Sequence, residues 1–276
     1  MNLSRMMTVM RTDLKQLAQS RDFWVPMSLL GGLFFLVIPA ILLSVINSVG
    51  SIGSVQQVSQ ALQLLPQSAQ NAVPQAASAG TKVSYVLAVY LLAPIAVIVP
   101  LTISTAVGSS SIVGERERGT GEFLAHSPAG VREIYLGKLI ASLIPGYLTT
   151  IVGFGLYSLM VNLIVGPDAG GWFFPTASWW LLILWVLPPF LAITLSLVLR
   201  LSAKVKSTAA AQQATGLVTL PLIIIAYGQS TGALATGGYT VSLAIGAIAW
   251  VIAGFRLITG VRSVRRGQLL GVADGV

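Results

Sequence analysis

Residues 83–111 read VSYVLAVYLLAPIAVIVPLTISTAVGSSS, and no side chain in this stretch carries a charge. Lys82 precedes it, and Glu115 is the first charged residue after it. About 20 apolar residues in an α-helix cross the ~30 Å hydrocarbon core of a bilayer. The stretch is therefore predicted to be a membrane-spanning helix, and similar stretches recur along the chain.

Six such spans are predicted, and the chain is expected to be an all-α, polytopic membrane protein. The last two share one uncharged run between Lys206 and Arg256, which the turn-like residues 228–238 divide. The predicted spans are residues 23–47, 83–111, 139–165, 177–199, 209–228 and 239–260.

The composition supports a membrane protein and excludes several classes. Of the 276 residues, 55% are hydrophobic and only 9% are charged, against about 25% charged in a typical soluble domain. Soluble enzymes and disordered chains are excluded on this ground. The chain has no cysteine, which also excludes disulfides, thiolate metal sites and cysteine nucleophiles.

The basic residues predict the topology. With six spans, every lysine and arginine except Lys82 falls on one side of the membrane. The positive-inside rule makes this side cytoplasmic, so both termini are expected in the cytoplasm. The net charge of +8 is then explained without a nucleic-acid partner.

Residues 1–22 are predicted to form an amphipathic helix on the cytoplasmic leaflet. One helical face carries Met6, Met10, Leu14 and Leu17. The polar residues expected largely off this face are Arg5, Arg11, Asp13, Lys15 and Gln16. The alternative is a frayed basic tail.

The external segment 48–82 and the tryptophans complete the outline. The segment is either a plain connection or a cap over an exit route, and the sequence favours neither. Four tryptophans fall near the predicted ends of spans and are expected to act as interfacial anchors: Trp24, Trp172, Trp179 and Trp180.

The cytoplasmic loop 112–138 is the most informative segment outside the spans. It contains Glu-Arg-Glu-Arg-Gly-Thr-Gly-Glu at 115–122. Alternating charges suit a protein surface of mixed sign better than anionic lipid headgroups. Gly119 and Gly121 permit a sharp turn, and Pro128 ends or restarts a helix. We expect a short protruding helical element that docks on a soluble partner, with an ordinary solvated loop as the alternative.

Chemistry by this chain alone is not expected. The chain lacks a phosphate-binding P-loop motif, because Leu139 follows Gly137 and Lys138. It has a single histidine, His126, and no acidic residue inside a predicted span, so a metal cluster and a carboxylate proton relay are not expected. The small residues at 108–111 are interpreted as helix packing.

The sequence offers few candidate residues for a substrate pathway. Four polar residues at possible membrane depth are candidates for lining it: Asn162, Gln212, Gln213 and Thr215. Groups of this kind more often cross-link helices than bind a ligand. A route lined mainly by apolar residues favours an amphiphilic or lipid-like substrate over a small ion.

The loop motif, Pro128 and the Leu-Gly-Lys sequence at 136–138 resemble the permease subunits of type-2 ATP-binding-cassette (ABC-2) transporters. The resemblance implies two permease chains, alike or related, and two cytoplasmic ATPase subunits that carry ATP and Mg²⁺. It implies export across the cytoplasmic membrane of a bacterium or archaeon. It also assigns residues to ATPase coupling or to its boundary: Glu115, Arg116, Glu117, Arg118, Gly119, Thr120, Glu122, Pro128 and Lys138. The main alternative is a membrane scaffold that binds a soluble partner without transport; a passive channel or ion-coupled carrier is a third.

Overall fold

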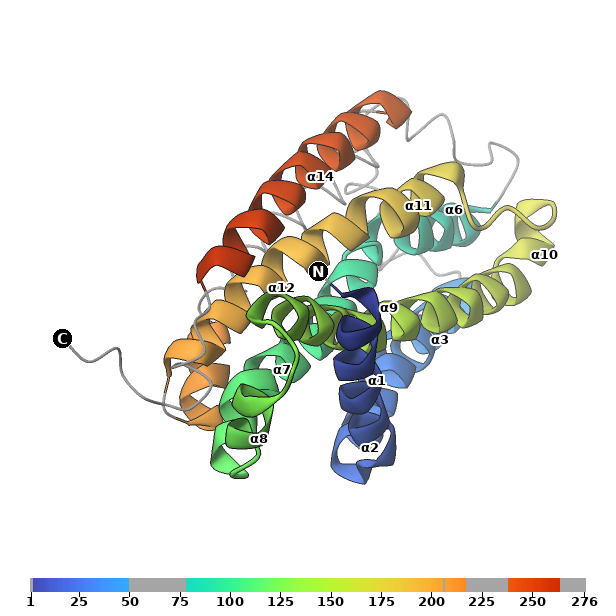
Figure 1. The fold of residues 1–276 in the computed structure, drawn as a ribbon. Helices are drawn as coiled ribbons and strands as arrows, with labels where there is room; N and C mark the ends of the chain where they lie inside the picture. Colours follow the sequence, from blue (N-terminus) through green and yellow to red (C-terminus); the bar gives the residue numbers. More distant parts are fainter. Residues whose placement is uncertain (1, 50–77, 206, 217–237, 264–276) are drawn as a thin grey trace.

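The computed structural model describes residues 2–49, 78–205, 207–216 and 238–263. These residues form helices joined by short turns, with no strand among them (Figure 1). The predicted all-α class is therefore confirmed for the described part of the chain.

Five helices in the described residues are long and apolar enough to cross a membrane: Arg21–Asn47, Gly80–Glu117, Val131–Ile164, Ala177–Lys204 and Thr240–Gly260. They correspond to five of the six predicted spans, and the helix boundaries differ from the predicted ones by up to eight residues. The predicted span 209–228 lies mainly outside the described residues, although residues 208–216 are helical. Most of the external segment, residues 50–77, also lies outside them.

Several of the long helices are composite. The first consists of α2 (Arg21–Gly32), η1 (Leu33–Val37) and α3 (Ile38–Val49). The second consists of α6 (Ala79–Val86), η2 (Leu87–Leu91) and α7 (Ile95–Glu117). The fourth consists of α11 (Ala177–Leu181), η3 (Leu182–Val186) and α12 (Leu187–Lys204). The remaining elements are α1 (Leu3–Gln19), α8 (Gly121–His126), α9 (Val131–Ile164), α10 (Gly166–Ala169) and α14 (Gly238–Ser263).

The central helices are α7, α9 and α12, which pack against one another. The most apolar windows of the second and fourth long helices are 72% and 67% buried, whereas those of the first and last are only 22% buried. The first and last helices therefore lie at the periphery (Figure 1). Their exposed apolar side chains, such as Leu29 and Val251, are suited to contact with lipid.

Small residues bring α7 and α12 together. A Cβ atom at Gly108 would lie 2.9 Å from a methyl carbon of Leu195. The Ser202 hydroxyl donates a hydrogen bond to the carbonyl of Ser109 at 2.6 Å. The interpretation of residues 108–111 as a packing surface agrees with this close approach.

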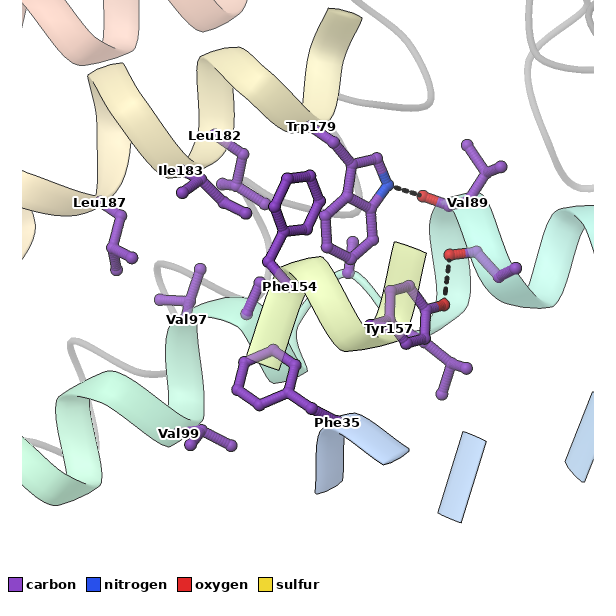
Figure 2. Close-up of a cluster of buried hydrophobic side chains, with 14 of the residues drawn as sticks. Phe35, Val89, Val97, Val99, Phe154, Tyr157, Trp179, Leu182, Ile183 and Leu187 are labelled. Carbon is purple, nitrogen blue, oxygen red and sulfur yellow. Dashed lines mark hydrogen bonds between the residues drawn. The ribbon is translucent and has the colours of Figure 1, made fainter. Parts of the chain in front are cut away.

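Three short π-helical segments, η1, η2 and η3, interrupt the long helices. The wide turn of a π-helix displaces backbone carbonyls from the regular ladder. Two carbonyls of η2 accept hydrogen bonds from aromatic side chains: Ala88 from the Tyr157 hydroxyl at 2.7 Å and Val89 from the Trp179 indole at 2.9 Å (Figure 2). Similarly, the carbonyl of Ile183 in η3 accepts from the Tyr147 hydroxyl at 3.3 Å.

An aromatic cluster fills the space between α9, η2 and α11 (Figure 2). The Trp179 ring stacks on Phe154 and Tyr157, with centroid distances of 5.7 and 5.5 Å, and meets Phe174 edge-on at 5.0 Å. Trp179 is only 1% exposed, so its predicted role as an interfacial anchor is wrong. Its neighbour Trp180 and the other two predicted anchors, Trp24 and Trp172, are exposed.

Candidate functional site: a charged junction and the cavity beside it

The molecule has two chemically different ends. We call the end that holds α1, the last turn of α7, α8 and the start of α9 the charged end (Figure 1). The opposite end, which holds residues 154–162, α10 and α11, is called the aromatic end.

Three helices meet at the charged end through one buried lysine. The Lys138 ammonium on α9 lies 3.1 Å from an Asp13 carboxylate oxygen on α1 and 3.3 Å from a Glu115 carboxylate oxygen on α7. The Lys138 side chain is 1% exposed. We call these three residues the charged junction. All three ion pairs found among the described residues involve at least one of them, the third joining Arg118 to Glu115.

A second contact holds the start of α1 against α9. The Glu133 carboxylate accepts hydrogen bonds from the backbone N–H groups of Asn2 and Gly130. In addition, Gly137 leaves room for α1, because a Cβ there would lie 3.0 Å from the Met6 carbonyl and from Val9. The amphipathic sequence of α1 thus packs on α9 near Lys138.

The packing face of α1 includes a charge. Met6 is buried and Met10, Leu14 and Leu17 are half-buried, which agrees with the predicted apolar face; that the helix lies on a membrane leaflet stays a prediction. Asp13, which was predicted to lie largely off this face, is half-buried on it. Its position seven residues after Met6, two helical turns along, was the signal in the sequence for this placement.

The junction is electrostatically unbalanced, because two carboxylates share one ammonium. Burial raises the pKa of the Asp13 carboxyl above its ordinary value, and the Lys138 ammonium beside it opposes this shift. Among the described residues, Arg118 is a further cation at the junction. Its guanidinium lies 3.9 Å from a Glu115 carboxylate oxygen, and the Arg118 side chain is 63% exposed.

The end of α7 is also tied to α12 and to the residues after it. Arg116 donates from its guanidinium to the carbonyls of Ser202 and Val205. The Glu117 carboxylate accepts from the backbone N–H and the hydroxyl of Thr208, both at 2.8 Å. These two residues, predicted as coupling residues, are therefore engaged within the chain.

The chain reverses between α7 and α8 at Gly119, whose φ of 72° favours glycine. The Thr120 N–H donates to the Glu115 carbonyl at 2.9 Å, and its hydroxyl donates to the Glu115 carboxylate. The predicted coupling residues that are exposed at this end are Arg118, Gly119, Thr120, Glu122 and Pro128, with Glu117 exposed beside them.

Helix α9 begins earlier than predicted. It starts at Val131, so Lys138 lies about two turns inside it rather than at the boundary of a loop. The predicted loop 112–138 is correspondingly reduced to the turns around α8. Lys138 is thus a buried member of the junction and is not part of the exposed surface.

A cavity of about 540 Å³ adjoins the junction. It lies between α1 and α2 on one side and α7 and α9 on the other, and Gln212 also lines it. Its charged lining residues are Asp13, Asp22, Glu115, Arg118 and Lys138. Its apolar lining includes Phe23, Met27, Leu30, Ile103, Ala106 and Val107.

The four predicted pathway residues do not gather in one place. Gln212 lines the cavity, whereas Gln213, Thr215 and Asn162 are not among its lining residues. Asn162 is buried at the aromatic end, where its carbonyl oxygen accepts from the N–H groups of Phe173 and Phe174 at 3.0 and 3.1 Å. It therefore fixes the turn before α11, as a packing residue does.

The comparison with protein families agrees with this architecture. The family model described as "ABC-2 family transporter protein" matches residues 7–260. The chain therefore belongs to the ABC-2 transporter family and is a multi-pass membrane permease of an ABC transporter. No curated protein was found to match it.

Proposed function

We propose that this permease exports an amphiphilic or lipid-like substrate, using ATP hydrolysed on a separate cytoplasmic ATPase subunit that docks at the charged end. Two permease chains and two ATPases make the transporter, and the ATPases carry the ATP and Mg²⁺. The membrane is the cytoplasmic membrane of a bacterium or archaeon. The family membership supports this arrangement.

The orientation follows from the charges. Arg5, Arg11 and Arg118 belong to the charged end, whereas Lys82 lies on α6, close to α10 at the aromatic end. The positive-inside rule then places the charged end in the cytoplasm. An ATPase in the cytoplasm meets this end first.

The observation that carries the proposal is the double role of Glu115. Its backbone carbonyl and carboxylate hold Thr120 of the turn before α8, and its carboxylate also pairs with Lys138. A force applied to α8 by a partner is thereby transmitted to α9 and, through Asp13, to α1. Coupling then requires no contact between the partner and the buried residues.

The exposed and the buried coupling residues have different roles under this proposal. Glu122 and Arg118 are exposed and contact the partner, where complementary charge fixes the docking geometry. Glu115 and Lys138 transmit the motion of the turn and of α8 to the rest of the bundle.

Copurification with the cognate ATPase in nanodiscs tests the docking surface. We expect the double variant Arg118→Ala/Glu122→Ala to weaken ATPase binding at least tenfold. Asp168→Ala, an acidic residue on α10 at the aromatic end, is the matched control and should bind normally. Equal binding by the native chain and the double variant would contradict docking at this end and would favour a membrane scaffold with another partner surface.

A further inference from the structure

The cavity beside the charged junction has the size and the two-sided lining of a ligand site. Its volume of about 540 Å³ is within the range of about 300–1,000 Å³ found for small-molecule sites. Charged groups line it at the junction, apolar side chains from α2 and α7 form another part of the lining, and uncharged polar residues such as Gln16, Ser110 and Gln212 complete it. A ligand that fills it therefore needs one polar end and one apolar end.

The charges on the junction side favour a cation. Among the described residues, three carboxylates line the cavity, those of Asp13, Asp22 and Glu115, against two cations. The Lys138 ammonium is covered and already shared between Asp13 and Glu115. The other cation, Arg118, is mostly in solvent. An entering headgroup thus meets an excess of negative charge in a partly desolvated site, where opposite charges attract more strongly than in water.

The apolar part of the lining favours an apolar chain on the ligand. Phe23, Met27 and Leu30 from α2 line the cavity together with Ile103, Ala106 and Val107 from α7. Ala106 is small and exposed to open space. Phe23 is also aromatic, and an aromatic ring in the lining is a favourable neighbour for an ammonium group.

We propose that this cavity binds a cationic amphiphile, with an amine or quaternary ammonium headgroup against Asp13 and Glu115 and an apolar chain between α2 and α7. The proposed ligand is also the substrate class of the proposed exporter. Only the transport of this ligand, and not its binding, rests on the proposed function. Binding requires no ATPase.

Equilibrium binding to the full chain in nanodiscs tests the site directly. The probes are dodecyltrimethylammonium and dodecanesulfonate, which share a chain length and differ in charge, with protein-free nanodiscs as the measure of partition into lipid. We expect saturable binding of the cationic probe and at least tenfold weaker binding of the anionic one.

Two variants localise the binding. Asp13→Asn removes the excess negative charge while leaving the pair between Lys138 and Glu115, and Ala106→Phe fills the apolar part. Each should weaken binding of the cationic probe at least tenfold. Ala247→Phe, the same exchange at an exposed position of α14, should bind within twofold of the native chain.

The outcomes separate this site from the coupling proposal. Equal binding of the cationic and anionic probes would overturn the site. Native affinity of Ala106→Phe for the cationic probe would also overturn it. This second result tests the site even if Asp13→Asn does not fold. Cationic binding that persists in Glu122→Ala, at an exposed docking residue outside the cavity lining, while ATPase binding is weakened supports the site independently of docking. Normal ATPase docking without saturable binding of the cationic probe would overturn the site alone.

Discussion

The two ends of α9 are held by different forces. At the charged end, Lys138 joins α1 and α7 through ion pairs of 3.1 and 3.3 Å. At the aromatic end, Tyr157 and Asn162 make only neutral hydrogen bonds, and Trp179 stacks against the helix. The same helix therefore meets its neighbours through charge at one end and through close packing at the other.

This difference indicates which end moves. The Lys138 ammonium is shared by two carboxylates, so it can shift toward either of them without being left unpaired, although removing it altogether is costly. A stacked aromatic cluster in a packed interior has few alternative arrangements of similar energy. We infer that the charged end rearranges when a partner acts on it and that the aromatic end anchors the bundle.

The largest expected effect is at the aromatic end. Trp179→Ala removes the centre of the cluster and one buried hydrogen bond, and should lower the free energy of unfolding by about 3–5 kcal/mol. Thermal unfolding in detergent measures the loss. Trp172→Ala, at a tryptophan that is 72% exposed, is the control and should unfold near the native temperature. An equal loss of thermal stability in the two variants would contradict the view that the buried Trp179 stabilises the aromatic end more than the exposed Trp172 does.

Lys138→Met tests the charged end and should cost about 3 kcal/mol, because it leaves two partly buried carboxylates without their cation. The triple variant Lys138→Met/Asp13→Asn/Glu115→Gln removes all three charges together and should recover most of the lost thermal stability. A triple variant less stable than Lys138→Met would show that the junction itself stabilises the fold.

Glycine substitutions on α9 sharpen the comparison further. Gly137→Ala places a methyl group against Met6 and Val9 and should cost about 1 kcal/mol as α1 is displaced. Gly155→Ala has no atom within 4 Å of the new group and should instead stabilise the helix by up to about 1 kcal/mol. Hydrogen exchange in residues 3–19 should rise in the first variant only. Unchanged exchange there would argue against the close docking of α1.

The smallest expected effect is a pH dependence at the charged end. Because the pKa of Asp13 is raised on folding, the folded chain binds more protons than the unfolded chain between the ordinary carboxyl pKa of about 4 and the raised value. The contribution of Asp13 to stability therefore increases as the pH falls through this window. The unfolding temperatures of the native chain and of Asp13→Asn, measured across pH 4–8, should therefore depend differently on pH, with the native chain gaining stability as the pH falls. The same pH dependence in both proteins would contradict this prediction.

Much of the fold is predictable from the sequence because the bilayer constrains it strongly. Charge-free stretches such as 83–111 give the spans, and helical spacing gives the packing face of α1. The predicted third span begins at residue 139, eight residues after the start of α9, because Lys138 bounds the uncharged run in the sequence. Lys138 pairs with Asp13, and Glu133 accepts from Asn2 as well as from the neighbouring Gly130. The pairings with Asn2 and Asp13 are not visible locally, because these residues are distant in sequence.

The candidate site was predictable only in part. The motif at 115–122 lies at the charged end, and Gln212, predicted as a pathway residue, lines the cavity there. That the cavity belongs to a substrate pathway stays a prediction. The division of the motif into exposed and inward-facing side chains depends on the positions of α1 and α12. Trp179 was misplaced for a similar reason, because a tryptophan near the end of a span has the same local sequence signal whether it faces lipid or a neighbouring helix.

The most direct test of the account is a distance measurement at both ends of the bundle. The chain has no cysteine, so spin labels at Met7→Cys and Leu148→Cys report on α1 and α9, and labels at Leu159→Cys and Leu184→Cys report on the aromatic end. In the complex with the ATPase, a non-hydrolysable ATP analogue should change the first distance and leave the second unchanged. The first change should disappear in the neutral triple variant of the junction. Two results would contradict transmission through the junction. One is a distance between the labels on α1 and α9 that does not change with nucleotide in the native complex. The other is an equal change of that distance in the neutral triple variant.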